Sequence, residues 1–138
     1  MPAEDQQRRR PTLERASIPL AVIGGGLVGS AARTAAGALA ATPAGAFPTT
    51  TLAVNLAGSL LLGWYLARRE RAAGSRWGLR FWAIGGLGSF TTFSAFGVEV
   101  VQLVEAGRSA VGIGYVLAST AGGLIMAAAG EQIGRTTR

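Results

Sequence analysis

The stretch GSFTTFSAF, residues 88–96, places two threonines, two serines and a glycine among three phenylalanines in the middle of an apolar segment. No charged residue occurs between positions 81 and 98 around it. At membrane depth, non-helical backbone is tolerated only where protein or a water-filled cavity surrounds it. We therefore predict that this stretch is a helix break and the functional centre of the chain.

The charge distribution predicts a membrane protein. Charged residues make up 14% of the 138 residues, against about 25% in soluble domains. The uncharged windows are residues 16–32, 34–67, 81–98 and 109–130. A membrane-spanning helix needs roughly 20 mostly apolar residues. We therefore predict an all-α integral membrane domain over residues 17–132, with the third helix broken near its middle. Its four transmembrane helices are expected at residues 18–41, 49–67, 80–105 and 109–131.

The basic residues predict the orientation of the chain. All 13 are arginines, and 11 of them lie in the N-terminal segment, in residues 68–80 and at the C-terminus. With four crossings these three segments share one side, and the positive-inside rule makes that side the cytoplasm. We therefore predict a multi-pass protein of the cell membrane with both termini in the cytoplasm.

The two ends of the chain are expected to lie outside the membrane domain. Residues 1–16 predict a disordered basic cytoplasmic tail, and residues 133–138 a short C-terminal tail. Arg8 to Arg10 offer a contact for anionic membrane lipid, although a purely topological role also explains them. Basic proteins often bind nucleic acid. Here the arginines flank apolar spans, so we expect no nucleic-acid partner.

The glycines of the first span have two explanations. Gly24, Gly26 and Gly29 match GxGxxG, which binds dinucleotides when an acidic residue follows about 20 positions later. No acidic residue stands near that distance. Gly25 and Gly29 also form a GxxxG pair, which lets two membrane helices approach closely. We therefore predict helix packing rather than a dinucleotide site.

Two charged residues lie inside predicted spans. Arg33 either faces the protein interior or a cavity, or extends to the outer interface. Glu99 lies one helical turn beyond Phe96, toward the same outer side. We expect the two charges at a vestibule or an interface, where they come close enough to form an ion pair.

Polar residues recur at helical spacing in the second and fourth spans. Asn55, Ser59 and Gly63 are four apart, as are Tyr115 and Ser119, so each set shares one helix face. The Asn55 face is explained by helix packing or by an amide N–H that meets a permeating anion. The spacing alone favours packing.

The third span carries the remaining candidate groups. Phe93 and Phe96 are three apart and point the same way in a helix. Carbonyls freed at a helix break can coordinate a cation. The chain has no Cys and no His, so it lacks thiol ligands and the commonest general base. No nucleophile–base pair is identifiable either, and we expect that the chain is not an enzyme.

Three motifs together resemble the Fluc/CrcB family of fluoride channels. They are GGGLVGSAAR at 24–33, TLAVNLAGSLLLG at 51–63 and GSFTTFSAFGVE at 88–99, and the resemblance covers nearly all of residues 18–131. It implies an antiparallel dimer of four-helix subunits with two fluoride pores and a central structural sodium ion. The implied function is passive efflux of cytoplasmic fluoride.

The resemblance also implies roles for single residues. Phe93 and Phe96 match paired phenylalanines whose ring edges face the anion, and an aromatic ring does have a positive edge. Gly88 and Thr91 match positions whose backbone carbonyls hold the sodium ion. The rest of the implied anion pore comprises Asn55, Thr92, Ser94, Tyr115 and Ser119.

This sequence departs from the family pattern in two ways. Ala95 and Gly123 stand where the pattern leads us to expect hydroxyl groups. The arginine bias also predicts one fixed orientation rather than insertion both ways. The antiparallel partner is then either a second copy that tolerates the bias or an oppositely oriented homologue.

Two other functions stay open. A small proton-coupled exporter needs a membrane-buried carboxylate, for which Glu99 is the only candidate in the interior of a predicted span. A non-transporting packing subunit would not need Phe93, Phe96 and Asn55 together. That combination favours the channel.

Overall fold

Four helices of the chain are long and apolar enough to cross a membrane. The structure, a computed structural model, describes the backbone of residues 3–40, 42–43, 46–72 and 75–137, and side chains from Ser17 onward except 71–72. The four candidate spans are Ser17–Leu39, Thr49–Glu70, Arg76–Glu105 and Ser109–Thr136. No strand occurs in these described parts. The predicted all-α architecture with four spans is confirmed.

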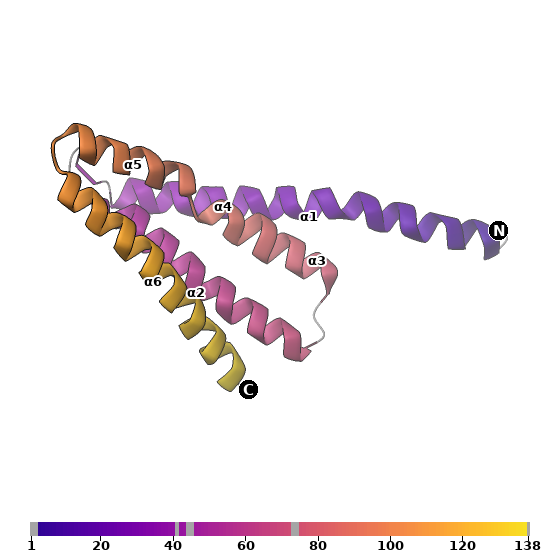
Figure 1. Cartoon of the computed structure of the whole chain (residues 1–138). Helices are drawn as coiled ribbons and strands as arrows, with labels where there is room; N and C mark the ends of the chain where they lie inside the picture. The colour runs from indigo at the N-terminus through magenta and orange to yellow at the C-terminus, as the bar shows by residue number, and fades with distance from the viewer. Residues whose placement is uncertain (1–2, 41, 44–45, 73–74, 138) are drawn as a thin grey trace.

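The first and last helices are longer than the sequence suggested. Helix α1 runs over Ala3–Leu39, and its N-terminal part projects beyond the other helices (Figure 1). Residues 3–16 are thus described as helix, where the sequence predicts a disordered tail. The segment is rich in Glu, Gln, Arg and Ala, which favour helix, and extending an existing helix needs no new nucleus. The lipid contact predicted for Arg8 to Arg10 lies outside the described side chains.

Helix α6 covers Ser109–Thr136 and so includes most of the predicted C-terminal tail. Glu131 and Arg135 form an i,i+4 ion pair in its last turns, a pairing that supports an exposed helix end. Arg68 of helix α2 (Thr49–Ala72) donates a hydrogen bond to the Thr137 hydroxyl at 3.1 Å. The start of α1, the end of α2 and the end of α6 lie toward one end of the bundle (Figure 1), so the helix ends that carry the arginine-rich segments share one side.

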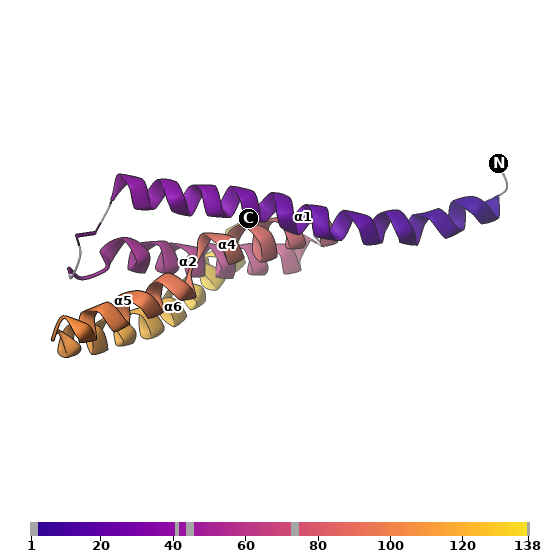
Figure 2. The same cartoon turned by 90° about the horizontal axis from the view of Figure 1, so that it is seen from above.

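The helices form two close pairs. Helix α2 (Thr49–Ala72) packs along α6, and α1 packs along η1 (Leu79–Leu87), while α1 and α2 touch much less. The third span consists of the short helix α3 (Arg76–Gly78), η1, α4 (Gly88–Phe90) and α5 (Phe93–Glu105). Its first half lies beside α1, whereas α5 lies along α6 (Figure 2). The third span therefore passes from one pair to the other at its break.

Glycines allow backbone contact in the α1–η1 pair. A Cβ atom added to Gly25 would lie 1.9 Å from the Phe81 carbonyl oxygen, and one added to Gly29 would lie 2.0 Å from that of Gly86. The predicted GxxxG packing is confirmed. The two glycines are four residues apart on an α-helix, and the two carbonyls are five apart on a π-helix. One π turn of η1 thus lies against one α turn of α1.

The α2–α6 pair uses the same device between two α-helices. A Cβ on Gly63 would come within 2.1 Å of the Ala127 carbonyl oxygen, and one on Gly130 within 2.0 Å of that of Leu60. Gly63 belongs to the Asn55 face, so packing explains that part of the face. Large apolar side chains such as Leu20 and Leu124 are exposed, as expected of a surface that faces lipid or another subunit.

The glycine contact can be tested with a matched pair of substitutions on α1. Gly29→Ala places a methyl group against the Gly86 carbonyl, whereas a Cβ at Gly37 meets nothing within 4 Å. Overpacking of a tight contact costs about 1–3 kcal/mol. We expect Gly29→Ala to lower the thermal unfolding midpoint in detergent, followed by tryptophan fluorescence, and Gly37→Ala to leave it unchanged. Equal midpoints would contradict the close contact.

Candidate functional site

The helix break lies at two threonines. Helix α4 ends at Phe90, and Thr91 (φ −73°, ψ 158°) and Thr92 (φ −143°, ψ 122°) are extended before α5 begins. The Thr92 hydroxyl accepts a hydrogen bond from the Ala95 N–H at 3.2 Å, so Thr92 is the N-cap of α5. The break predicted within residues 88–96 is confirmed, and its position follows from the capping ability of threonine.

Asn55 of α2 holds the break through both ends of its amide. Its Nδ2 donates to the Thr92 carbonyl at 2.9 Å, and its Oδ1 accepts from the Thr92 N–H at 2.8 Å. The side chain thus pairs with the backbone of one extended residue as a neighbouring strand would. An amide nitrogen carries two N–H groups, so one remains for another partner. Asn55 is first of all a structural residue here, and its predicted contact with an anion depends on that second N–H.

The Gly88 and Thr91 carbonyls are among the backbone groups that the break frees. In a continuous helix the Gly88 carbonyl would accept from the Thr92 N–H, and the Thr91 carbonyl from the Ala95 N–H. Asn55 takes the first donor, and the Thr92 hydroxyl takes the second. Neutral carbonyl oxygens are ligands that hard cations accept. The two residues predicted to hold sodium therefore offer the type of donor that such an ion accepts.

An open groove of about 350 Å³ runs along the break. It lies between α2, α6 and the two halves of the third span, and none of its lining residues is charged. It brings together seven predicted site residues, namely Asn55, Gly88, Thr91, Thr92, Phe93, Phe96 and Ser119. Ser59 and Thr120 line it as well and were not predicted as site residues. Their only sequence signals are the Asn55 spacing and the neighbouring Ser119.

The two phenylalanines at the groove differ in exposure. The Phe93 and Phe96 rings have centroids 5.7 Å apart and planes inclined by 40°, so they lie side by side as predicted. Phe96 also contacts the Tyr115 ring at 5.2 Å. Phe93 is 83% exposed, which is unusual for so large an apolar side chain at the centre of a span. Its ring is available to an anion or to another subunit.

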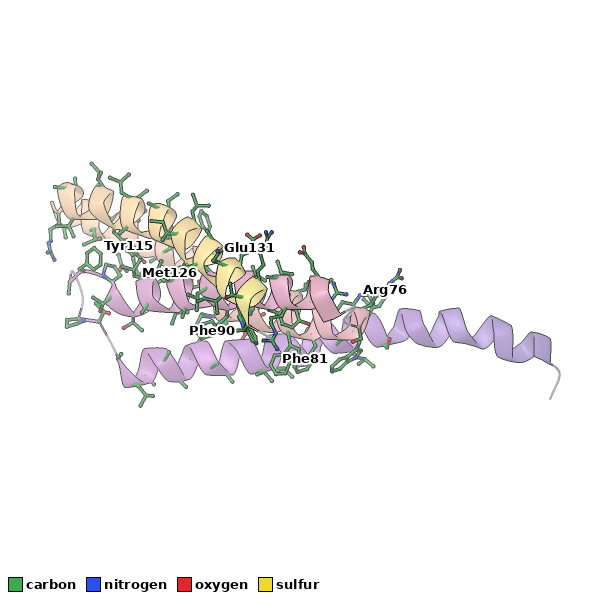
Figure 3. The ribbon with its side chains drawn as sticks, turned by 90° about the horizontal axis from the view of Figure 1, so that it is seen from below. Arg76, Phe81, Phe90, Tyr115, Met126 and Glu131 are labelled. Carbon is green, nitrogen blue, oxygen red and sulfur yellow. The ribbon has the colours of Figure 1, made fainter. Side chains whose placement is uncertain are left out.

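Tyr115 is fully buried and lies toward the opposite end of the bundle from Arg76 (Figure 3). Its hydroxyl donates to Glu99 Oε2 at 2.7 Å, and the Thr51 hydroxyl donates to Glu99 Oε1 at 2.6 Å. The Tyr115 hydroxyl therefore uses its one proton in the hydrogen bond to the Glu99 carboxylate. One turn further along α6, the buried Ser119 hydroxyl has no hydrogen-bond partner among the described residues.

Arg33 and Glu99 line a common cavity of about 430 Å³, together with Ser94. The ion pair expected between these two charges does not form among the described residues. Both Glu99 oxygens accept hydrogen bonds from hydroxyl groups. Arg33 Nε instead donates to the Ser89 carbonyl at 3.1 Å. Each charge thus has a local partner that the sequence spacing did not reveal.

The family model for CrcB-like protein, Camphor Resistance (CrcB), matches residues 20–131 of the chain. The chain belongs to the CrcB family. Three similar proteins are each named a fluoride-specific ion channel. The one from Paracoccus denitrificans is 41% identical over 80% of this chain and 89% of its own length. The one from Listeria monocytogenes (EGD-e) is 46% identical over 64% of this chain and 70% of its own length. The one from Pseudomonas fluorescens SBW25 is 39% identical over 80% and 91%.

The matched segment contains both the helix break and the groove. CrcB-family membership and the channel names of the relatives confirm the prediction that the chain is not an enzyme. They also confirm the resemblance that the three motifs indicated. The roles of the single groove residues in this CrcB-family chain stay predictions.

The Asn55 contact makes a stability prediction for the break. Asn55→Leu removes both hydrogen bonds to Thr92 and leaves its backbone groups unsatisfied, which costs about 1–3 kcal/mol each. We expect a lower unfolding midpoint in detergent. Ser59→Ala, one turn along α2, removes only a hydroxyl that bonds to its own helix and should change the midpoint little. Equal effects of the two substitutions would show that Asn55 does not hold the break.

Proposed function

We propose that the chain is a subunit of a fluoride channel that lowers cytoplasmic fluoride by passive efflux across the cell membrane. The observation that carries the proposal is the uncharged groove at the helix break, which joins two phenylalanine rings to amide and hydroxyl groups. The relatives named as fluoride-specific channels support it. Fast conduction requires several successive sites, each of which binds the ion only weakly. A groove without a fixed positive charge meets that requirement.

The proposed anion path uses weak donors. The positive ring edges of Phe93 and Phe96 meet the anion without trapping it. The second N–H of Asn55 and the unpartnered hydroxyl of Ser119 can donate to it. The hydroxyls of Thr92 and Ser94 lie 3.3 Å apart and would donate to the anion as it approaches the two rings. Tyr115 would border the path beside Phe96, and its hydroxyl could reach the anion only by leaving Glu99.

A structural sodium ion is proposed at the break. Gly88 and Thr91 would hold it through the two carbonyls that lose their helical donors. When bound, the ion would supply positive charge between opposing carbonyl groups. A sodium ion needs more oxygen ligands than these two carbonyls, because hard cations are surrounded by several oxygens. A second subunit with the same break would complete the set.

We also propose an antiparallel dimer with two pores, which the shape of the groove supports. The groove is open on one side of the subunit, and the exposed Phe93 ring projects there for a partner to cover. We propose cytoplasmic termini because of the arginine bias. The partner is then a second copy inserted the other way or an oppositely oriented homologue.

Fluoride efflux from liposomes tests the proposed function. The chain, alone or with an oppositely oriented homologue, should release fluoride at a rate that an ion-selective electrode follows. Phe93→Ile should abolish release because it removes a ring edge from the path. Phe90→Ile removes a ring of the same span that does not line the groove and should leave release intact. Absence of efflux in both preparations would refute the channel.

The orientation proposal has a separate test. A reporter fused to the C-terminus, with activity on only one side of the membrane, should show a single cytoplasmic population. That result would favour a homologue as the antiparallel partner, because all copies of this chain would then point the same way. Equal populations on the two sides would contradict a fixed orientation.

A further inference from the structure

Arg33 continues the row of α1 residues that packs against the third span. Gly25, Gly29 and Arg33 are four residues apart and share one helix face. The two glycines lie against the carbonyls of Phe81 and Gly86. The next carbonyl that this face meets is that of Ser89, which accepts from Arg33 Nε at 3.1 Å. The arginine therefore extends the glycine contact up to the break.

The Ser89 carbonyl needs a donor that the helix does not supply. In a continuous helix it would accept from the N–H of Phe93. The extended residues Thr91 and Thr92 interrupt that register, so this carbonyl is one of the unpaired groups at the carboxyl end of α4. Cations stabilise a helix at this end because the helix dipole is negative there. A guanidinium is thus matched to this position in charge and in hydrogen bonding.

Among the described residues, no carboxylate forms an ion pair with Arg33. It lines two cavities, of about 220 and 430 Å³. Glu99 is the only acidic residue in their linings, and both of its oxygens accept hydrogen bonds from Thr51 and Tyr115. The helix end is therefore the local counterpart of the Arg33 charge.

We propose that Arg33 is a positioning residue that caps the first half of the third span and fixes the break from α1, while Asn55 fixes it from α2. Ser89 lies directly after Gly88 and two residues before Thr91. Holding its carbonyl therefore sets the placement of the two freed carbonyls and the direction in which α5 leaves the break. This role concerns the geometry of the break and does not depend on which ion the protein carries.

Spin labels can read that geometry directly. The chain has no native cysteine, and a Cβ at Gly37 of α1 or at Gly97 of α5 meets nothing within 4 Å. Cysteines at these two positions place one label on α1 and one on α5, the helix that leaves the break. Labelled protein is diluted with unlabelled protein in liposomes without fluoride, so that pulsed electron resonance reports the distance within one subunit.

The variants to compare in this labelled protein are Arg33→Gln, Arg33→Lys and Arg108→Gln. Arg33→Gln removes the cation and should broaden the distance distribution. Arg33→Lys keeps a cation and N–H donors and should restore a narrow distribution. Arg108→Gln removes a charge just beyond α5, away from the break, and should leave the distribution narrow.

A distribution for Arg33→Gln as narrow as that for Arg108→Gln would overturn the proposal. If Arg33→Gln does not yield folded protein, Arg33→Lys decides: a narrow distribution supports the capping role, and a broad one overturns it. Because the measurement is made without fluoride, its failure is separate from failure of the proposed channel function.

Discussion

Two hydrogen bonds between the Asn55 side chain and the backbone of Thr92 stabilise the break in the third span. By taking the Thr92 N–H, Asn55 deprives the Gly88 carbonyl of its helical donor. The extended Thr92 then caps α5 with its hydroxyl, which frees the Thr91 carbonyl as well. The break and the release of the Gly88 and Thr91 carbonyls depend on this contact. In an apolar environment the alternative, unsatisfied backbone groups, would be costly.

The two glycine-packed helix pairs position α2 and the third span so that Asn55 can reach Thr92. Backbone approaches backbone in both pairs, since a Cβ at Gly29 or at Gly130 would lie 2.0 Å from a carbonyl oxygen of the neighbouring helix. The third span starts against α1 and ends along α6, so its break lies where the pairs meet. The groove forms there and is lined by uncharged groups only. An anion in it would meet dipoles and ring edges, which bind more weakly than a fixed cation.

The spans and the break could be predicted because their signals are local. Charge-free windows mark the helices, and the cluster of threonines and serines marks the interruption. The partners of Asn55, Arg33 and Glu99 could not be predicted, since each depends on how distant helices meet. The same holds for the π turn of η1, whose Phe81 and Gly86 carbonyls lie against Gly25 and Gly29. The N-terminal segment was misjudged because its polarity outweighed its helix propensity and its continuity with α1.

The most direct test of this account measures the coupling between Asn55 and the Thr92 N–H. Replacing Thr92 with its α-hydroxy acid analogue turns that N–H into an ester oxygen and keeps the side chain. The unfolding free energies of this variant, of Asn55→Leu and of the two combined form a double-mutant cycle. We predict that the ester destabilises the protein when Asn55 is present and has little further effect when it is absent. Additive losses would contradict the claim that this hydrogen bond holds the break.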